Sequence, residues 1–334
     1  MRAPANAKIL FRAAVLAAAL APAAALAPTR RVQIYDTTLR DGTQGEAISC
    51  SVDDKLKIAA RLSKLDVDYI ECGWPGSNPK DAEFFDRAAE ELDDVARSKL
   101  VAFGSTRSKR SASAAEDPQL AALVASKVPT ACIVCKGSSW QTTEILGASR
   151  EENLEMISSS VAFLVSQNVK VHVDLEHFYD GFLGARSAPA DPDYALQCAQ
   201  TAVAAGAEAV VLCDTNGGRL PWDVADATAA VVAAVPSTVS VGVHAHDDSG
   251  LAVANSLAAV RAGATLVQGT QNGVGERTGN ANLNAVVGAL ALKGDRVFED
   301  GATPELACAA RLETLSATSR FVDETLNLAP RASQ

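Results

Sequence analysis

The chain has 334 residues, of which 48% are hydrophobic and 5% aromatic, and its formal net charge is −10. This length fits one large α/β domain or two ordinary ones. An acidic chain without a basic cluster in its body argues against nucleic acid as a partner.

The first 34 residues differ in charge from the rest, because they contain five Lys or Arg and no Asp or Glu. Within them, "AAVLAAALAPAAALA" (13–27) is apolar but interrupted by Pro22, which makes it too short and too broken to span a membrane. A basic start followed by an apolar stretch predicts a removable targeting segment at residues 1–30. A plastid address is favoured; a secretory signal, a cytoplasmic location and a buried first helix are the alternatives.

From residue 32 onward, short β-branched runs that end in polar residues alternate with amphipathic helical stretches. In the first helical stretch, Ser51 is a plausible N-cap, and Ile58, Leu62 and Leu65 have helical spacing. Strands that alternate with helices predict a parallel sheet. Eight apolar runs are expected to be strands, at residues 32–36, 67–73, 100–105, 130–136, 169–175, 207–214, 239–246 and 264–270.

Eight such units match the length of a closed (β/α)8 TIM barrel of the α/β class, which we expect at residues 31–296. A helical extension is expected at 297–334. The alternative is a doubly wound open sheet, but neither a dinucleotide-binding nor a P-loop glycine pattern follows the first run.

The seven cysteines are scattered through apolar runs, and an odd number of this kind does not form a disulfide framework. "CIVC" (132–135) has the spacing of a redox motif, but in a strand Cys132 and Cys135 would point to opposite faces. We therefore expect core cysteines and a reducing compartment, which favours a plastid interior over export.

In a TIM barrel the active site lies at the carboxyl ends of the strands. His244 and His246 of "GVHAHDDSG" follow the seventh run and share one side of it, because strand side chains alternate. With a carboxylate they would hold a divalent ion that leaves positions open for substrate. Asp36 and Asp41 both flank the first run, and the pattern does not choose between them. It does not choose among Mn, Zn and Mg either.

Three motifs in this order carry a family resemblance: "YDTTLRDGTQGE", "HAHDDSG" and "GERTGNANL". From about residue 32 to 325 the chain resembles the Claisen-type acyl-CoA synthases and lyases, which include 2-isopropylmalate, homocitrate and citramalate synthases and hydroxymethylglutaryl-CoA lyase. "ECGWPGSNPKDAEFF", "LVAFGSTR" and "CDTNGG" most resemble the citramalate synthase branch. The lyase's cysteine-bearing glycine loop has no counterpart, since "NGVGERTGN" contains no Cys.

The resemblance implies a metal site formed by Asp41, His244, His246 and Asn280. It therefore selects Asp41 over Asp36. Arg40 matches the arginine beside the oxygen of the α-keto acid, where a fixed cation can stabilise a developing alkoxide.

Further matches imply the rest of the site. Gln44 matches a glutamine near the metal, and Thr215 a threonine that binds the keto acid carboxylate. Glu176 matches a glutamate that could act as general base on acetyl-CoA. Glu276 and Gly275 are candidates for shaping the thioester site.

The chain also departs from the family pattern. Family members continue past "SRFVDETLNLAPRASQ" with a histidine-bearing subdomain and a regulatory domain, so we expect a barrel truncated before both. His177, next to Glu176, is the nearest substitute for that histidine.

The function implied is condensation of acetyl-CoA with pyruvate to (R)-citramalate and CoA, as the first step of a pyruvate route to isoleucine. The family resemblance also implies a homodimer. The alternatives are a 2-isopropylmalate or homocitrate synthase type, a lyase-like enzyme, or a catalytically incomplete barrel that binds metal or keto acid. The pyruvate preference rests on the branch resemblance, because a pocket that differs by a few methyl groups discriminates by only about 1–3 kcal/mol per group.

Overall fold

A computed structural model describes residues 28–46, 48–186 and 188–329. Eight parallel strands form a closed barrel in chain order, and the last pairs with the first. This confirms the expected (β/α)8 barrel. The barrel strands are β2 (Gln33–Asp36), β3 (Tyr69–Glu71), β4 (Leu100–Ser105), β5 (Thr130–Lys136), β6 (Lys170–Glu176), β7 (Ala209–Asp214), β8 (Ser240–Ala245) and β9 (Leu266–Gly269).

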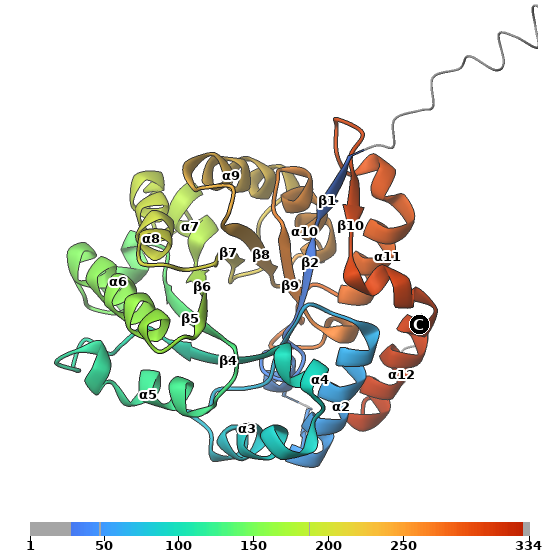
Figure 1. The fold of residues 1–334 in the computed structure, drawn as a ribbon. Coiled ribbons are helices and arrows are strands. Elements are labelled where there is room, and N and C mark those ends of the chain that lie inside the picture. The colour runs from blue at the N-terminus through green and yellow to red at the C-terminus, as the bar shows by residue number, and fades with distance from the viewer. Residues whose placement is uncertain (1–27, 47, 187, 330–334) are drawn as a thin grey trace, which may run out of the picture.

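Helices surround the barrel, as Figure 1 shows. The first of them begins at Ser51, whose hydroxyl accepts from the Asp54 backbone N–H in a capping box, and it buries Ile58, Leu62 and Leu65 as expected. The helices are α2 (Val52–Leu65), α3 (Pro79–Glu91), α4 (Asp94–Ser98), α5 (Pro118–Ala125), α6 (Arg150–Ser166), α7 (Phe178–Leu183), α8 (Pro192–Ala204), α9 (Pro221–Ala234), α10 (Ala252–Arg261), α11 (Leu283–Lys293) and α12 (Leu315–Thr325).

The barrel buries two separate layers of side chains. Outward-facing strand residues pack under the helices in the main core, where Ile133 and Cys135 lie. Inward-facing residues fill the barrel with a second cluster that contains Val101, Cys132 and Val211. Cys132 and Cys135 thus face opposite sides of β5, as the strand period requires. All seven cysteines are buried and free.

A two-stranded sheet outside the barrel was not expected from the sequence. β1 (Thr29–Arg31) pairs in parallel with β10 (Thr303–Glu305), and the two lie side by side in Figure 1. Arg30 strengthens the contact, because its guanidinium lies 4.7 Å from the centre of the Phe298 ring and pairs with Asp300. The boundary expected between the targeting segment (1–30) and the barrel (31–296) therefore falls inside β1.

The region after residue 296 packs back on the barrel. In α12, Ser319 and Asp323 accept hydrogen bonds from the Asn272 side chain, the first through its backbone oxygen. Arg61 of α2 donates to Thr318 of the same helix. Within the described ranges, every helix is too short or too polar to cross the bilayer. The expected targeting segment lies outside the described residues, except for its last three.

Candidate active site

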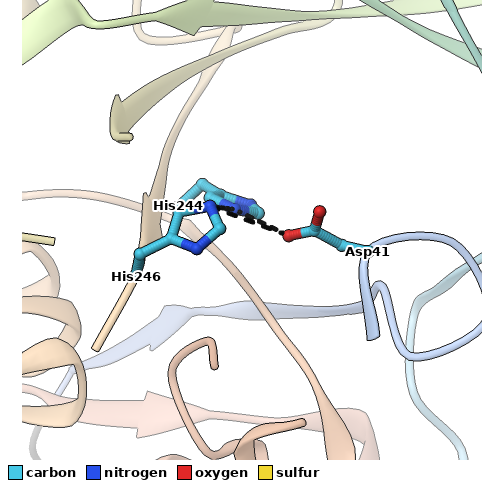
Figure 2. Close-up of side chains that lie close together, drawn as sticks. All are labelled: Asp41, His244 and His246. Carbon is cyan, nitrogen blue, oxygen red and sulfur yellow. Dashed lines mark hydrogen bonds and ion pairs between the residues drawn. The ribbon is translucent and has the colours of Figure 1, made fainter. Parts of the chain in front are cut away.

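Strand alternation brings polar side chains from several strands to one end of the barrel interior. In β8, Val243 and Ala245 face outward, so His244 and His246 face inward. Asp41 comes from the turn after β2, where its backbone N–H donates to the Thr37 carbonyl at 2.9 Å. This turn carries Asp41 over the end of the barrel toward the two histidines (Figure 2).

The three side chains form a compact cluster. Asp41 Oδ2 lies 3.2 Å from His244 Nε2 and 3.9 Å from His246 Nε2, and the two Nε2 atoms are 3.3 Å apart. Of all the described residues, these are the only His, Cys, Asp and Glu side chains that meet as a group able to hold a metal ion. All three are buried.

The structure gives different surroundings to the two aspartates at the end of β2 and in the turn that follows it. Asp36 is already engaged elsewhere, because its Oδ2 accepts from Gln271 Nε2 at 2.8 Å and its Oδ1 from the Thr38 backbone N–H at 2.9 Å. Asp41 Oδ2, in contrast, is buried and accepts no hydrogen bond from any described residue. A buried carboxylate oxygen in this state is suited to a cation.

Arg40 is held in place beside this cluster. Its Nε donates to Glu71 Oε1 at 2.5 Å and its Nη1 to Asp41 Oδ1 at 2.8 Å, while the guanidinium lies 3.8 Å from the centre of the Phe103 ring. Burial alone would raise the pKa of Asp41, but Arg40 and the histidines hold it well below its usual range. Asp41 is therefore ionised at neutral pH.

Several acidic side chains are buried near Arg40. Three buried carboxylates, those of Asp41, Glu71 and Asp174, share one guanidinium, that of Arg40. Burial raises the pKa of Glu71 and of Asp174, because a charge removed from water is costly. A divalent cation at the histidines would favour the charged forms of these carboxyl groups.

The donor atoms also fit a divalent cation. His244 Nδ1 lies 2.7 Å from Gln268 Oε1, which leaves Nε2 free as a ligand. Asn280 is joined to His246 by a β-bridge, and its buried Oδ1 has no hydrogen-bond partner among the described residues. Two imidazoles, a carboxylate and an amide oxygen suit Zn or Mn, and less strongly Mg.

A pocket of about 360 Å³ opens on this cluster. It brings together eight of the ten residues expected from the sequence: Arg40, Asp41, Gln44, Glu176, Thr215, His244, His246 and Glu276. The ninth, Asn280, is buried behind His246, and the tenth, Gly275, lines a neighbouring pocket. Gly275 has φ +154°, and a Cβ atom there would lie 2.2 Å from Asn280 Nδ2, so a larger residue would displace that amide.

Glu176 has a partner that the sequence analysis missed. Lys136, the last residue of β5, is in register with Glu176 of β6 and donates to its Oε2. Both side chains line the pocket and are partly exposed. The signal was present in the sequence, because Lys136 ends the apolar run 130–136 in the same way that the other candidates end theirs.

Thr215 is also positioned by neighbours. Its Oγ1 accepts from the His177 backbone N–H at 2.8 Å, and its carbonyl accepts from Arg277 Nη2 at 2.9 Å. β6 ends at Glu176, and His177 adopts the left-handed conformation, with φ +57°. The ring of His177 pairs with Asp180 at 3.1 Å, so its contact lies with the helix that follows, α7.

One side of the pocket is apolar, and the sequence analysis did not locate it. Trp74, Phe103 and Val134 line this wall. The Trp74 and Phe103 rings meet edge to face at 5.3 Å, and Trp74 Nε1 donates to Gln119 at 2.6 Å. The wall lies beside Arg40, since the Phe103 ring also contacts that guanidinium.

Comparison with known proteins places this chain in a family. The model of the HMGL-like family matches residues 31–322. An (R)-citramalate synthase of Streptomyces coelicolor is 46% identical over 302 residues, which cover 90% of this chain and 53% of the relative. A 2-isopropylmalate synthase of Salinibacter ruber is 33% identical and is covered over 52% of its length. The chain thus spans about half the length of the curated relatives it matches.

Solved structures show the same fold. The HMG-CoA lyase of Bacillus subtilis superposes with a TM-score of 0.71 over 92% of this chain and 98% of that one, at 19% identity. At this identity the likeness concerns the fold alone. Because the family model covers nearly all of the described residues, the chain belongs to the HMGL-like family.

Proposed function

We propose that this chain is the catalytic barrel of a citramalate-forming enzyme, which condenses acetyl-CoA, pyruvate and water to (R)-citramalate and CoA. The observation that carries the proposal is the 46% identity to the Streptomyces coelicolor synthase over 90% of the chain. The pocket supports it, because it combines a candidate metal site, a fixed guanidinium and an apolar wall.

The proposed roles follow from the contacts. Asp41, His244, His246 and Asn280 would hold a divalent ion, Mn, Zn or Mg, which when bound supplies Lewis acidity to the keto oxygen. Arg40 would stabilise the alkoxide that forms as the keto carbon is attacked, since Glu71 and Asp41 hold its guanidinium before substrate arrives.

The remaining groups would bind and orient the substrates. The Thr215 hydroxyl would donate to the keto acid carboxylate while it accepts from His177. The methyl group of pyruvate would face Trp74, Phe103 and Val134, whereas a longer side chain would collide with the two rings. Gln44 would lie near the metal, and Glu276 and Gly275 would border the thioester.

Glu176 would remove a proton from the methyl group of acetyl-CoA. Its pairing with Lys136 bears on this role, because the ammonium occupies Oε2, one of the two oxygens that could take the proton. We propose that Lys136 leaves Glu176 for a substrate anion before the proton is removed. Replacing Lys136 with Met should then reduce turnover more than it reduces acetyl-CoA binding.

We also propose a plastid location, a homodimer and a place in isoleucine synthesis. The basic, acid-free residues 1–30 and the seven buried thiols support the first of these. The division into a targeting segment (1–30), a barrel (31–296) and an extension (297–334) is part of the same proposal, with β1 lying across the first boundary.

The test is release of free CoA thiol from acetyl-CoA by the full chain loaded with Mn²⁺ or Zn²⁺. Pyruvate should be the best acceptor, and mass spectrometry should identify citramalate; Asp41→Ala is the inactive control. Faster release with 2-ketoisovalerate or 2-ketoglutarate would assign the chain to another condensing type. Binding of metal and pyruvate without thiol release would identify a catalytically incomplete barrel.

A further inference from the structure

Gln268 connects a candidate metal ligand to a buried carboxylate on the other side of the barrel. It lies on β9 and is fully buried. Its Oε1 is 2.7 Å from His244 Nδ1, and its Nε2 donates to Asp174 Oδ1 at 3.0 Å. His244 belongs to the adjacent strand β8, whereas Asp174 belongs to β6, which is not a neighbour of β9. The contact therefore crosses the barrel interior.

The direction of these two contacts follows from the chemistry of an amide. An amide has a donor end and an acceptor end, and the donor end of Gln268 faces the Asp174 carboxylate. Its acceptor end must then face His244, so His244 Nδ1 carries the proton. The lone pair of that imidazole is consequently on Nε2, the atom 3.2 Å from Asp41 Oδ2.

The second histidine shows what this arrangement adds. His246 Nδ1 is buried and has no hydrogen-bond partner in the described part of the chain, so no side chain holds that side of its ring. The two candidate ligands thus differ, since Gln268 holds the Nδ1 of His244 and no described residue holds the Nδ1 of His246.

We propose that Gln268, itself held by Asp174, is a positioning residue that fixes the tautomer and ring orientation of His244 and so sets the affinity of the site for divalent cations. This inference rests on the metal site of the proposed function. Partners of this kind, one shell behind a metal ligand, typically change metal affinity by about 10–100-fold when they are removed.

The experiment measures Mn²⁺ affinity by calorimetry and the visible spectrum of bound Co²⁺ for the full chain. Gln268→Leu should weaken Mn²⁺ binding by about 10–100-fold and shift the Co²⁺ spectrum. Gln271→Leu is the matched control, because Gln271 is equally buried and bonds a carboxylate, that of Asp36, away from the histidines. It should leave both readouts unchanged.

A double variant tests the role of the amide directly. In Gln268→Glu combined with Asp174→Asn, the new carboxylate can accept from both the His244 Nδ1–H and the new amide, so the tautomer is kept. Most of the Mn²⁺ affinity that Gln268→Leu loses should be retained in this double variant. If Gln268→Leu does not fold, Gln268→Asn decides the question, because its shorter amide cannot reach both partners and should also weaken binding.

The outcomes separate this inference from the proposed function. Wild-type affinity and an unchanged Co²⁺ spectrum in a folded Gln268 variant would overturn the inference and leave the metal site standing. An equal loss in Gln271→Leu would also overturn it, because the effect would then be general destabilisation. A wild-type chain that binds no divalent cation would refute the metal site itself, and this inference with it.

Discussion

Two histidines inside the same barrel have opposite surroundings. His172 of β6 lies low in the interior, where its ring meets Tyr69 at 4.8 Å and Tyr35 at 5.9 Å. His244 of β8 lies near the carboxyl ends of the strands, with Gln268 on one ring nitrogen and Asp41 near the other. Both are almost completely buried, so burial alone does not make a histidine a candidate ligand.

The difference lies in the polar groups that surround each histidine ring. Burial lowers the pKa of His172 to about 4, and its Nδ1 has no partner in the described residues. Burial opposes the charged form of His244 too, but the Asp41 carboxylate outweighs it and raises that pKa. The lower interior, where His172 lies, thus keeps a histidine neutral and leaves its Nδ1 without a partner in the described residues. The upper interior, at the carboxyl ends of the strands, surrounds His244 with candidate metal ligands and carboxylates.

The largest expected effect comes from removing the Asp41 carboxylate, which distinguishes the surroundings of His244 from those of His172. Asp41→Ala should weaken Mn²⁺ binding by more than the roughly 100-fold that a residue behind the ligands can cost, and turnover should be abolished. Asp36→Asn is the control and should bind Mn²⁺ normally, since Asp36 bonds Gln271 and Thr38 instead. Calorimetry measures both. Stoichiometric Mn²⁺ in Asp41→Ala at wild-type affinity would refute the assignment.

The next test concerns the fixed cation of the upper interior. Arg40→Lys should lower kcat by about 10²–10³-fold, the usual cost of losing one positioned charge at a developing oxyanion. Lysine lacks the planar fork that lets Arg40 contact Glu71 and Asp41 together. Steady-state kinetics with Mn²⁺ binding as a parallel readout checks this. Near-normal kcat would remove Arg40 from the mechanism.

The lower interior gives a test based on pH. Because the pKa of His172 in the folded chain is about 4 and that of an unfolded histidine is about 6.5, the unfolded chain binds an extra proton between these values. The free energy of unfolding should therefore fall as the pH drops from 6.5 to 4, by about 2–3 kcal/mol from this residue at pH 4.5.

His172→Leu should remove this part of the acid sensitivity. Urea unfolding of the metal-free chain at pH 7 and pH 4.5 measures it, as the difference between variant and wild type in the change between the two pH values. His246, whose pKa burial and His244 lower to about 4, contributes equally to both proteins and cancels. Equal losses of stability in the two proteins between pH 7 and pH 4.5 would show that the pKa of His172 is not lowered in the folded chain.

The smallest expected effect concerns the apolar wall of the upper interior. Trp74→Ala should raise kcat/KM for 2-ketoisovalerate relative to pyruvate by about 10-fold, within the range that one apolar contact provides. Trp222→Ala is the matched control, because Trp222 is 63% exposed on α9 and should change nothing. An unchanged ratio in Trp74→Ala would place the keto acid side chain elsewhere.

Much of the candidate site could be predicted because it lies where strands end. His244, His246, Thr215 and Glu176 each follow or close an apolar run, and parallel strands bring such residues to one end of the barrel. Gln268 and Asp174 were missed because they lie within apolar runs, "ATLVQGT" and "VKVHVDL", where a single polar residue carries no signal of its own. Their importance comes from contacts across the barrel.

The sequence by itself determined the eight strands, their order and the end of the barrel that carries the chemistry, because strand and helix periods are local properties of the chain. Only the tertiary structure decided which polar residues meet. In the folded chain, Asp36 accepts a hydrogen bond from Gln271, and Glu176 accepts one from Lys136. Asp41 lies beside the histidines. These choices depend on the path of one turn and on the register of neighbouring strands, which bring together side chains as many as 235 positions apart.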